Sequence, residues 1–415
     1  MGQVKKWYHI NIRGDKVIWR IVILLLIVSA LVIYSASSSL AAKYDVSNFH
    51  YLLKQIGFAI GGLATLFIFY KIPLGVYRSL AYPAFYISLI LLLVTIFFGD
   101  EINGARRWLK IGGVSIQTSE LVKVTFILYL AKCFENNESL DFKNLLIKVI
   151  APLGVTCILI LVGSTSTTLF VAIISAAILW LANVPKKHFI YSCLIAIALL
   201  FTAYGVHKVA SINGGSGIFP RFDTAENRII NFFSGDLDTG GLTKEQIQKE
   251  ADKNYQADMA RIAISSGGFF LHNGPGRSLQ RNNLPHPYSD FVFAIIIEEY
   301  GLLVGAFIIF LYLAILYRCV VLISNCTQMF TRITVAGIGL SITLQAFLHM
   351  AVNLGIIPVT GHTLPLISLG GTSVIIMCAS FGIILSVSRT IDTTTVDKAI
   401  EKIAQDNENT IKSDN

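Results

Sequence analysis

The stretch LPHPYSDFVFAIIIEEYG, from Leu284 to Gly301, shows most directly how this chain is built. Two prolines keep its first residues extended, and an apolar helix is predicted to begin at Phe291. Asp290 therefore stands where a polar loop meets an apolar helix. A carboxylate at such a boundary is costly and usually functional, so Asp290 is a candidate reactive group. The alternative is a helix N-cap formed by Ser289 or Asp290, because the helix dipole favours an acid there.

The composition of the whole chain is that of a membrane protein. Its 415 residues are 54% hydrophobic and 14% charged, and the mean hydropathy is +0.65. An apolar run of about 20 residues can span a bilayer as a helix, and this chain has many such runs. The pattern excludes an ordinary soluble domain and predicts an all-α polytopic membrane protein. The net charge of +8 is attributed to cytoplasmic anchoring of the helices and not to nucleic-acid binding.

Ten transmembrane helices in one bundle are predicted from the apolar runs and the charged turns between them. The membrane domain covers residues 17–388, after a basic cytoplasmic segment (1–16) and before a polar tail (389–415) that is predicted to be disordered. The loop 208–289, between helices seven and eight, is the one long connection. The helices are assigned to residues 17–38, 55–70, 79–98, 116–134, two within 149–185 with a break near 163–168, 188–206, 291–323, and two within 333–388 separated by 353–365.

The distribution of charge orients this bundle. If the basic N-terminus is inside, ten helices return the C-terminus to the cytoplasm, and the loops 99–115 and 208–289 face outward. The cytoplasmic turns then obey the positive-inside rule, whereas the outward loop 99–115 breaks it with Arg106, Arg107 and Lys110. Basic residues on the outer side need a reason, and an anionic ligand is the natural one.

Two neighbouring segments supply groups suited to an anion. In the motif NGARRW, Arg106 and Arg107 match the geometry of phosphate oxygens, and Trp108 suits the membrane interface. On the next predicted helix, Glu120 and Lys123 are three residues apart, so they can form an ion pair. The alternatives are contact with lipid headgroups for the two arginines and a purely structural ion pair for Glu120 and Lys123.

Other polar groups lie at or inside predicted helices. Lys54, at the outer end of helix two, either faces a cavity shared with these anion-binding candidates or extends its ammonium group to the membrane interface. Glu298 and Glu299 lie about two turns into the helix after Asp290, and a buried ion pair with a basic residue is predicted for both. The prolines and glycines of 353–373 interrupt the helix, and such backbone at membrane depth is tolerated when it is buried or lines a cavity. The histidines and six cysteines show no metal-ligand spacing.

Three motifs, in this order, resemble those of the SEDS family (shape, elongation, division and sporulation; the FtsW- and RodA-type proteins). They are NGARRW with QTSELVK, LPHPYSDF with EEYG, and NLGIIPVTGHTLPLISLGGTS, and the resemblance covers residues 15–390. The segments NRIINFFSGD and GPGRS are most similar to the cell-division, FtsW-type branch. The chain departs from the family pattern at GSTSTT (163–168), which replaces an acidic motif, at Thr118, which replaces a proline, and at Lys54, which replaces an arginine.

The resemblance implies a peptidoglycan glycosyltransferase that polymerises lipid II, a disaccharide-pentapeptide on undecaprenyl diphosphate. It implies action at the outer face of the cytoplasmic (inner) membrane during septal wall synthesis. The implied partners are a class B penicillin-binding protein, an FtsI-like transpeptidase, and other divisome membrane proteins. The alternatives are a lipid II flippase, a RodA-like elongation polymerase and a scaffold that only recruits the crosslinking enzyme.

The resemblance also implies roles for the candidate residues. Asp290 is expected to be the general base that takes the proton of the attacking sugar hydroxyl. Arg107 and Lys123 are expected to bind the diphosphate and stabilise its charge on departure. Glu120 and Trp108 are expected to belong to the same cavity, together with Arg106 and Lys54. No cofactor is required by the sequence, although a divalent cation, Mg²⁺ or Mn²⁺, would assist the leaving group.

Overall fold

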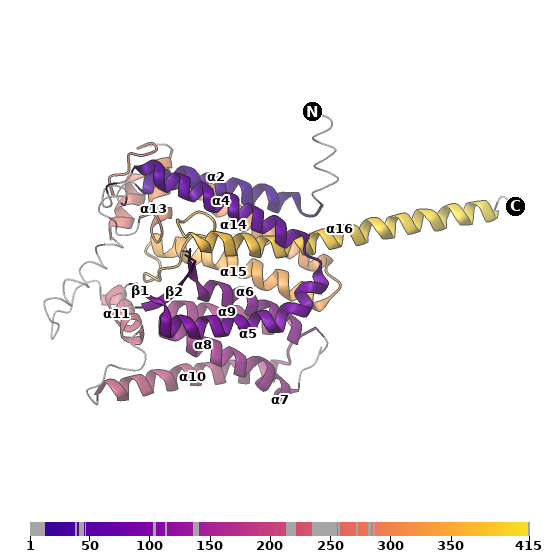
Figure 1. The fold of residues 1–415 in the computed structure, drawn as a ribbon, viewed down its shortest axis with the longest axis horizontal. Helices are drawn as coiled ribbons and strands as arrows, with labels where there is room; N and C mark the ends of the chain where they lie inside the picture. Colours follow the sequence, from indigo (N-terminus) through magenta and orange to yellow (C-terminus); the bar gives the residue numbers. More distant parts are fainter. Residues whose placement is uncertain are drawn as a thin grey trace.

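A computed structural model of the chain describes residues 13–413 except 38–39, 41–44, 46, 103–104, 113, 136–140, 213–220, 235–254, 256–257, 271–272, 281–283 and 285–286; beyond residue 392 it describes the backbone alone. Long helices run side by side in one bundle, and a small sheet lies at one end of it (Figure 1). The first long helix begins, and the last one leaves the bundle, at the opposite end (Figure 1). The two chain ends therefore lie on one side, as the even number of predicted spans requires.

The elements follow the predicted order along the chain. The helices of the first half are α2 (Lys16–Ala36), α4 (Asn48–Lys71), α5 (Leu74–Phe98), α6 (Thr118–Cys133), α7 (Phe142–Leu145), the π-helical η1 (Leu146–Ile150), α8 (Ala151–Gly163), α9 (Thr165–Leu181) and α10 (Lys186–Ile212). The helices of the second half are α11 (Arg221–Ser234), α13 (Val292–Tyr300), α14 (Leu302–Asn325), α15 (Met329–Asn353) and α16 (Thr372–Ser413).

The described part of the chain contains eight helices that are long and apolar enough to cross a bilayer, one of which is α7, η1 and α8 joined end to end. The helix α9 is apolar but shorter, with 17 residues. The helix α6 has 16 residues, includes Glu120 and Lys123, and meets neither description. The protein is thus a multi-pass membrane protein, and the count of ten spans stays a prediction.

Several helix boundaries differ from the prediction. The helix α4 begins at Asn48 and not at Gln55, because the side chain of Ser47 caps it by accepting a bond from Phe49 N (3.2 Å). Its first turn contains polar residues, so an apolar count alone places the start too late. The helix α16 continues to Ser413, through most of the tail for which disorder was predicted.

The segment 99–115, predicted to be a polar loop, instead forms most of a three-stranded antiparallel sheet. Its strands are β1 (Asp100–Ile102), β2 (Ala105–Ile111) and β3 (Val114–Gln117), in the order β1-β2-β3. Trp108 pairs with Gln117 across β2 and β3. Gly112, in the turn between these strands, has φ +58°, a conformation that glycine adopts without strain. The loop prediction was wrong because the charges of β2 hid its alternating pattern.

The long connection after α10 and the helix that follows it are also more structured than expected. The segment 208–289 contains α11 and a second short helix over 258–266. The predicted helix 291–323 is two helices, because Gly301 has φ +89° and separates α13 from α14. The glycine in EEYG therefore ends a helix, and α13, the helix that follows Asp290, is only 9 residues long.

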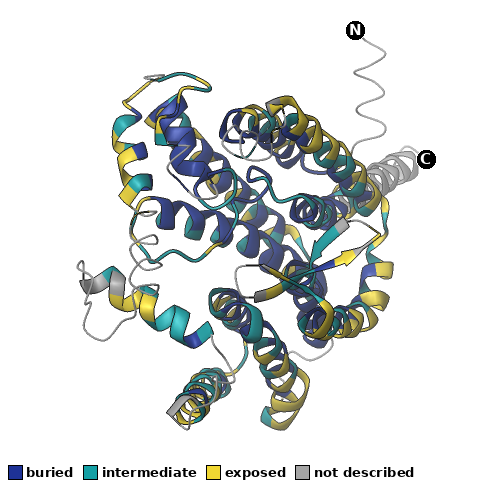
Figure 2. Cartoon of the chain, turned by 60° about the vertical axis from the view of Figure 1, so that its left-hand side comes forward, coloured by how far each residue is buried: buried dark blue, intermediate teal, exposed yellow. Residues whose placement is uncertain are grey.

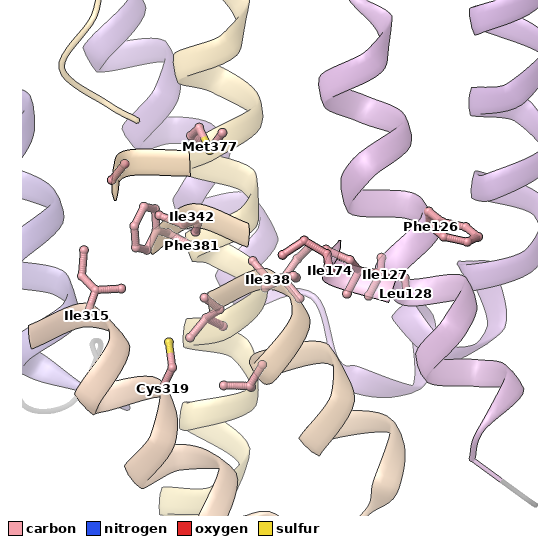
Figure 3. Close-up of a cluster of buried hydrophobic side chains, with 14 of the residues drawn as sticks. Phe126, Ile127, Leu128, Ile174, Ile315, Cys319, Ile338, Ile342, Met377 and Phe381 are labelled. Atoms are coloured by element: carbon pink, nitrogen blue, oxygen red, sulfur yellow. The ribbon is translucent and has the colours of Figure 1, made fainter. Parts of the chain in front are cut away.

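The core of the bundle surrounds α15. Its central residues are dark blue, and exposed residues gather on the outer helices (Figure 2). Ile338 and Ile342 of α15 lie among side chains from the neighbouring helices, including Ile127 of α6, Ile174 of α9 and Phe381 of α16 (Figure 3). The helix α10 lies at the margin of the bundle (Figure 1). The non-helical segment 354–371 joins α15 to α16 and reaches the end of the bundle that carries the sheet.

Candidate functional site

A cavity of about 500 Å³ lies at the end of the bundle that carries the sheet. Its walls come from the start of α9, from α11, and from the non-helical segment after α15. Three arginines line it, namely Arg107 of β2 and Arg221 and Arg228 of α11. The remaining wall is mostly apolar or carries hydroxyl groups, and includes Ser164, Thr165, Ser166, Phe170, Ile229, Thr360 and His362.

The arginines make this cavity strongly positive. Burial, followed by the nearby guanidinium groups of Arg221 and Arg228, lowers the pKa of Arg107 to about 10. Burial and then Arg221 likewise lower the pKa of Arg228. Arginine stays protonated in proteins, so all three groups carry a positive charge at neutral pH. A cavity of this kind suits a phosphate or diphosphate group.

Local contacts hold the elements that carry these three arginines. Arg107 lies along β2, and its Nε donates to the carbonyl oxygen of Gly163 at 2.7 Å. The helix α11 is tied to α10 by two polar contacts, His207 Nε2 to Asp223 Oδ1 at 3.0 Å and Lys208 Nζ to Glu226 Oε2 at 2.9 Å. The arginines of α11 thus face the cavity from a helix that is anchored on its other side.

Sequence reasoning found Arg107 but missed Arg221 and Arg228. These two residues are seven positions apart in RFDTAENRIINFFS, a spacing that places both on one face of a helix. That spacing was the available signal. It was overlooked because the segment 208–289 was treated as one loop.

Asp290 lies at the end of a turn that precedes α13. The N-cap residue of α13 is Phe291, and no side chain caps the helix, so the N-cap alternative for Ser289 or Asp290 is wrong. A Cβ atom added at Gly361 would lie 3.8 Å from the carboxylate oxygen Oδ2 of Asp290. The carboxylate also raises the pKa of Arg107 and of Arg228, so it is within electrostatic reach of the arginine cluster.

The turn that carries Asp290 is held through its backbone. Leu369 N donates to the carbonyl of Tyr288 at 2.9 Å, and Ser368 Oγ donates to the carbonyl of Ser289 at 2.8 Å. Asn353 Nδ2 donates to the carbonyl of Asp290 at 3.0 Å. All three donors belong to the end of α15 or to the segment after it. The non-helical backbone predicted over 353–373 is thereby confirmed, and it positions the carboxylate.

Asn353 makes a second contact that fixes the direction of α13. Its Oδ1 accepts a bond from Ala294 N at 3.0 Å, so a residue of α15 satisfies an amide in the first turn of α13. Its Nδ2 also donates to the carbonyl of His349 at 2.8 Å. The side chain is fully buried. One amide group therefore joins α15, α13 and the Asp290 turn.

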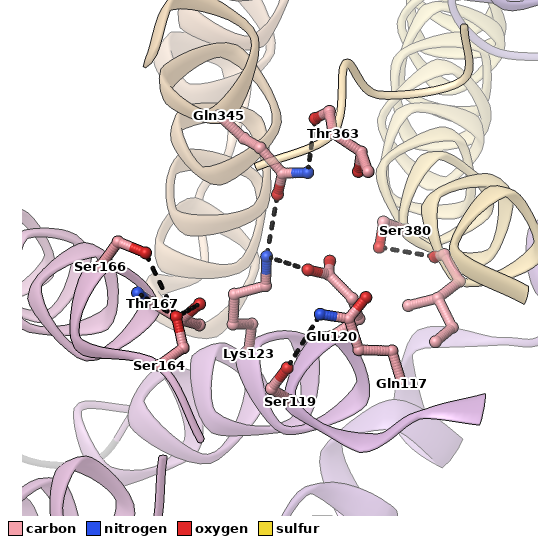
Figure 4. A network of polar contacts seen from close by, with 11 residues as sticks. Gln117, Ser119, Glu120, Lys123, Ser164, Ser166, Thr167, Gln345, Thr363 and Ser380 are labelled. Atoms are coloured by element: carbon pink, nitrogen blue, oxygen red, sulfur yellow. Dashed lines mark hydrogen bonds and ion pairs between the residues drawn. The ribbon is translucent and has the colours of Figure 1, made fainter. Parts of the chain in front are cut away.

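The predicted ion pair between Glu120 and Lys123 is confirmed. Lys123 Nζ lies 2.7 Å from Glu120 Oε1 and donates to Gln345 Oε1 at 2.8 Å. Gln345 Nε2 in turn donates to the carbonyl of Thr363 at 3.1 Å, and Figure 4 shows the chain of contacts. Lys123 also lies 5.0 Å from the ring centre of Phe170. This network links α6 to α15 and to the non-helical segment.

The structure does not bring all seven predicted site residues together. Lys123 and Glu120 are buried, and neither lines the large cavity, although Phe170 beside Lys123 does. Arg106 is exposed, donates to the carbonyl of Phe97 at 3.0 Å and lies 3.9 Å from a Glu101 carboxylate oxygen. Trp108 is half-buried in β2, and Lys54 is exposed on α4; neither lines the cavity.

The two acids after Asp290 hold a loop. Glu298 accepts bonds from Ser278 Oγ, from Leu279 N at 2.8 Å and from Gln280 N at 3.2 Å. A basic partner was predicted for Glu298, and the described residues contain none, because three neutral donors satisfy the carboxylate instead. Glu299 accepts bonds from Ser35 Oγ and from Ser278 N. Among the described residues there is no group of three or more His, Cys, Asp or Glu that could hold a metal ion.

The sequence matches a family model and several known proteins. A family model described as "Cell cycle protein", covering FtsW, RodA and SpoVE, matches residues 15–393. The "Probable peptidoglycan glycosyltransferase FtsW" of Hydrogenovibrio crunogenus is 31% identical over 396 residues, which are 92% of this chain and 94% of the relative. The "Peptidoglycan glycosyltransferase MrdB" of Escherichia coli is 29% identical over 390 residues, 92% of this chain and 95% of the relative.

Solved structures share the fold. A chain from a peptidoglycan synthase complex, described as coordinating polymerization and crosslinking, superposes with a TM-score of 0.69 and 25% identity, over 91% of this chain and 98% of that one. The rod shape determining protein RodA of Thermus thermophilus superposes with a TM-score of 0.62 and 22% identity, over 91% of this chain and 97% of its own. The helical membrane fold therefore belongs to a known architecture.

Proposed function

Because the chain belongs to the FtsW, RodA and SpoVE family of cell cycle proteins, we infer that it is a peptidoglycan glycosyltransferase that polymerises lipid II. The observation that carries this function is the cavity lined by Arg107, Arg221 and Arg228. Asp290 does not line this cavity, but its carboxylate is within electrostatic reach of Arg107 and Arg228. A membrane-embedded site with clustered cations and one nearby acid suits a substrate that combines a lipid, a diphosphate and sugars.

The proposed reaction divides the work between these groups. A sugar hydroxyl of one lipid II molecule attacks the anomeric carbon of the sugar that is joined to the diphosphate of a second lipid-linked substrate. The bond from that carbon to the diphosphate oxygen breaks. The hydroxyl proton passes to the carboxylate of Asp290, which acts as general base. Undecaprenyl diphosphate leaves with the electron pair of the broken bond. The products are one new glycosidic bond, the lipid diphosphate and a protonated Asp290.

The arginines supply the electrostatic part of the mechanism. Charge builds up on the diphosphate as it leaves, and fixed guanidinium groups stabilise that charge without reorganising. Arg107 is expected to take part as the sequence implied, joined by Arg221 and Arg228, which line the same cavity. Lys123 is assigned a supporting role, because Glu120 and Gln345 use two of its three ammonium donors and it does not line the cavity.

The site is proposed to face the outer side of the cytoplasmic membrane. The elements β2 and α11, which supply the arginines of the cavity, lie at the end of the bundle opposite the start of α2 and the exit of α16 (Figure 1). The basic N-terminal segment favours the cytoplasm. A class B penicillin-binding protein is the proposed partner, because a related chain belongs to a complex that couples polymerization to crosslinking. Septal synthesis is the proposed setting; the similarity to MrdB keeps a RodA-like elongation role as the alternative.

The function is tested with purified protein, its partner and labelled lipid II in detergent, followed by a gel that separates glycan strands. Detergent removes any need for flipping, so glycan strands identify a polymerase. Failure to form strands, together with transport of lipid II across reconstituted vesicles, would instead establish a flippase. Recruitment of the crosslinking enzyme without either activity would establish a scaffold.

Arg228→Ala is expected to raise the KM for lipid II roughly ten- to hundredfold, the effect of losing a charged hydrogen bond of about 1.5–3 kcal/mol. Arg221→Ala should act in the same direction. Steady-state polymerisation rates over a range of lipid II concentrations measure the change. Arg20→Ala, an exposed arginine at the start of α2, is the matched control and should leave KM unaltered. An unchanged KM in both cavity variants would contradict the proposed diphosphate site.

A further inference from the structure

The short turn between α8 and α9, residues 163–166, contacts three separate parts of the site. The carbonyl of Gly163 accepts the bond from Arg107 Nε at 2.7 Å. Thr165 Oγ1 donates to the carbonyl of Arg221 at 3.0 Å, and Ser166 Oγ donates to the carbonyl of Thr360 at 3.1 Å. This turn is part of GSTSTT, the segment in which the chain departs from the pattern of similar proteins. Its role is not explained by the mechanism above.

Each contact controls a different wall of the cavity. Arg221 is the first residue of α11, so the bond from Thr165 fixes the end of the helix that carries Arg221 and Arg228. Thr360 lines the cavity and precedes Gly361, the residue next to the Asp290 carboxylate. The bond from Ser166 therefore fixes the wall that faces Asp290. The two hydroxyl groups act on the cation side and the acid side of the site respectively.

The hydroxyl groups are not free to serve as phosphate donors. A serine or threonine hydroxyl has one proton to donate, and Thr165 and Ser166 each give theirs to a backbone carbonyl. Ser164 Oγ accepts from Thr167 N and thereby caps α9, and it lies 3.2 Å from Ser166 Oγ, to which it can donate its own proton. A diphosphate, which only accepts hydrogen bonds, gains nothing from an oxygen whose proton is already used. The turn thus acts on the site through the elements that it holds.

We propose that Thr165 and Ser166 are positioning residues: Thr165 places the arginines of α11 for the diphosphate, and Ser166 places the 360–362 segment against Asp290. The proposal rests on the proposed polymerase function. It also separates two effects, because the Thr165 contact leads to binding groups and the Ser166 contact leads to the reacting carboxylate.

The two roles predict different kinetic changes. Thr165→Val keeps the shape of the side chain but removes the donor, and is expected to raise the KM for lipid II about three- to tenfold, the size of one neutral hydrogen bond. Its kcat should fall as well, to the extent that the displaced arginines stabilise the departing diphosphate less. Ser166→Ala is expected to lower kcat by a similar factor with little change in KM. The variants Thr165→Ser and Ser166→Thr keep the hydroxyl and should restore each value. Thr65→Val, which removes an intrahelical bond in α4, is the control for hydroxyl loss.

A double-mutant comparison tests the route of the effect. In an Arg221→Ala, Arg228→Ala background, Thr165→Val should cause no further rise in KM, whereas Ser166→Ala should still lower kcat. An equal rise in KM from Thr165→Val in both backgrounds would overturn the positioning role. A fall in kcat and a rise in KM that come with a lower unfolding temperature would overturn it too.

Binding of undecaprenyl diphosphate to the detergent-solubilised protein needs no turnover. Thr165→Val should weaken this binding three- to tenfold, the size of one neutral hydrogen bond, and Thr165→Ser should not. Unchanged binding in Thr165→Val would overturn the inference whether or not the wild-type protein forms glycan strands. Absence of strands from the wild-type protein with intact binding would instead count against the polymerase function alone.

Discussion

Asp290→Asn is expected to stop glycan polymerisation while the protein remains folded and inserted. The change removes the group that accepts the hydroxyl proton, and a general base contributes about 10²–10⁴-fold to a rate. The fold should survive because Asp290 caps no helix, and its turn is held by bonds to backbone carbonyls. Strand formation from labelled lipid II in detergent measures the loss, and thermal unfolding in the same detergent measures the stability.

The matched control is Asp258→Asn, the same change at an exposed acid in the same long segment. Asp258 lies 3.4 Å from Arg261 on the surface helix 258–266, where a solvated ion pair contributes little. Its loss should leave the polymerisation rate and the unfolding temperature near the wild-type values. Polymer from Asp290→Asn at near wild-type rate would refute the assignment of the general base.

Lys123→Ala is expected to destabilise the protein by about 3–5 kcal/mol, because it leaves the buried carboxylate of Glu120 without its partner. Glu120 Oε2 has no hydrogen-bond partner among the described residues, so Oε1 and its contact with Lys123 carry the compensation. The change also removes the donor to Gln345, which holds Thr363. Thermal or denaturant unfolding in detergent measures the effect.

The double variant Lys123→Met, Glu120→Leu separates this role from substrate binding. Replacing both charges by apolar groups removes the unpaired carboxylate, so most of the lost stability should return. If Lys123 instead contacted the diphosphate, Lys123→Ala would weaken lipid II binding at unchanged stability. The double variant would then bind as poorly as the single one.

Much of the helical framework was predictable because membrane helices are marked by long apolar runs. The interruption after Asn353 was predictable from prolines and glycines, and the Glu120–Lys123 pair from its spacing of three. The boundary of loop and helix at Asp290 was predictable as well, since α13 begins at Val292. In each case a local pattern in the sequence was enough.

The parts that were missed depend on contacts between distant segments. The apposition of Arg107 with Arg221 and Arg228 requires β2 and α11 to meet, which no local pattern specifies. The neutral partners of Glu298 come from residues 278–280. No local pattern in the sequence predicts that this segment packs on α13. The sheet was missed for a different reason, since its strands are short and rich in charge.

The turn at 288–290 has a consequence for how this site can change over time. Its three backbone carbonyls accept hydrogen bonds from Leu369, Ser368 and Asn353. These bonds do not involve the side chains of the turn. Support and chemistry are therefore separable units. Replacement of Asp290 therefore changes the side chain that the turn carries but removes none of these three bonds. Tyr288 is different, because its side chain packs against the core cluster that includes Leu284 and Phe291.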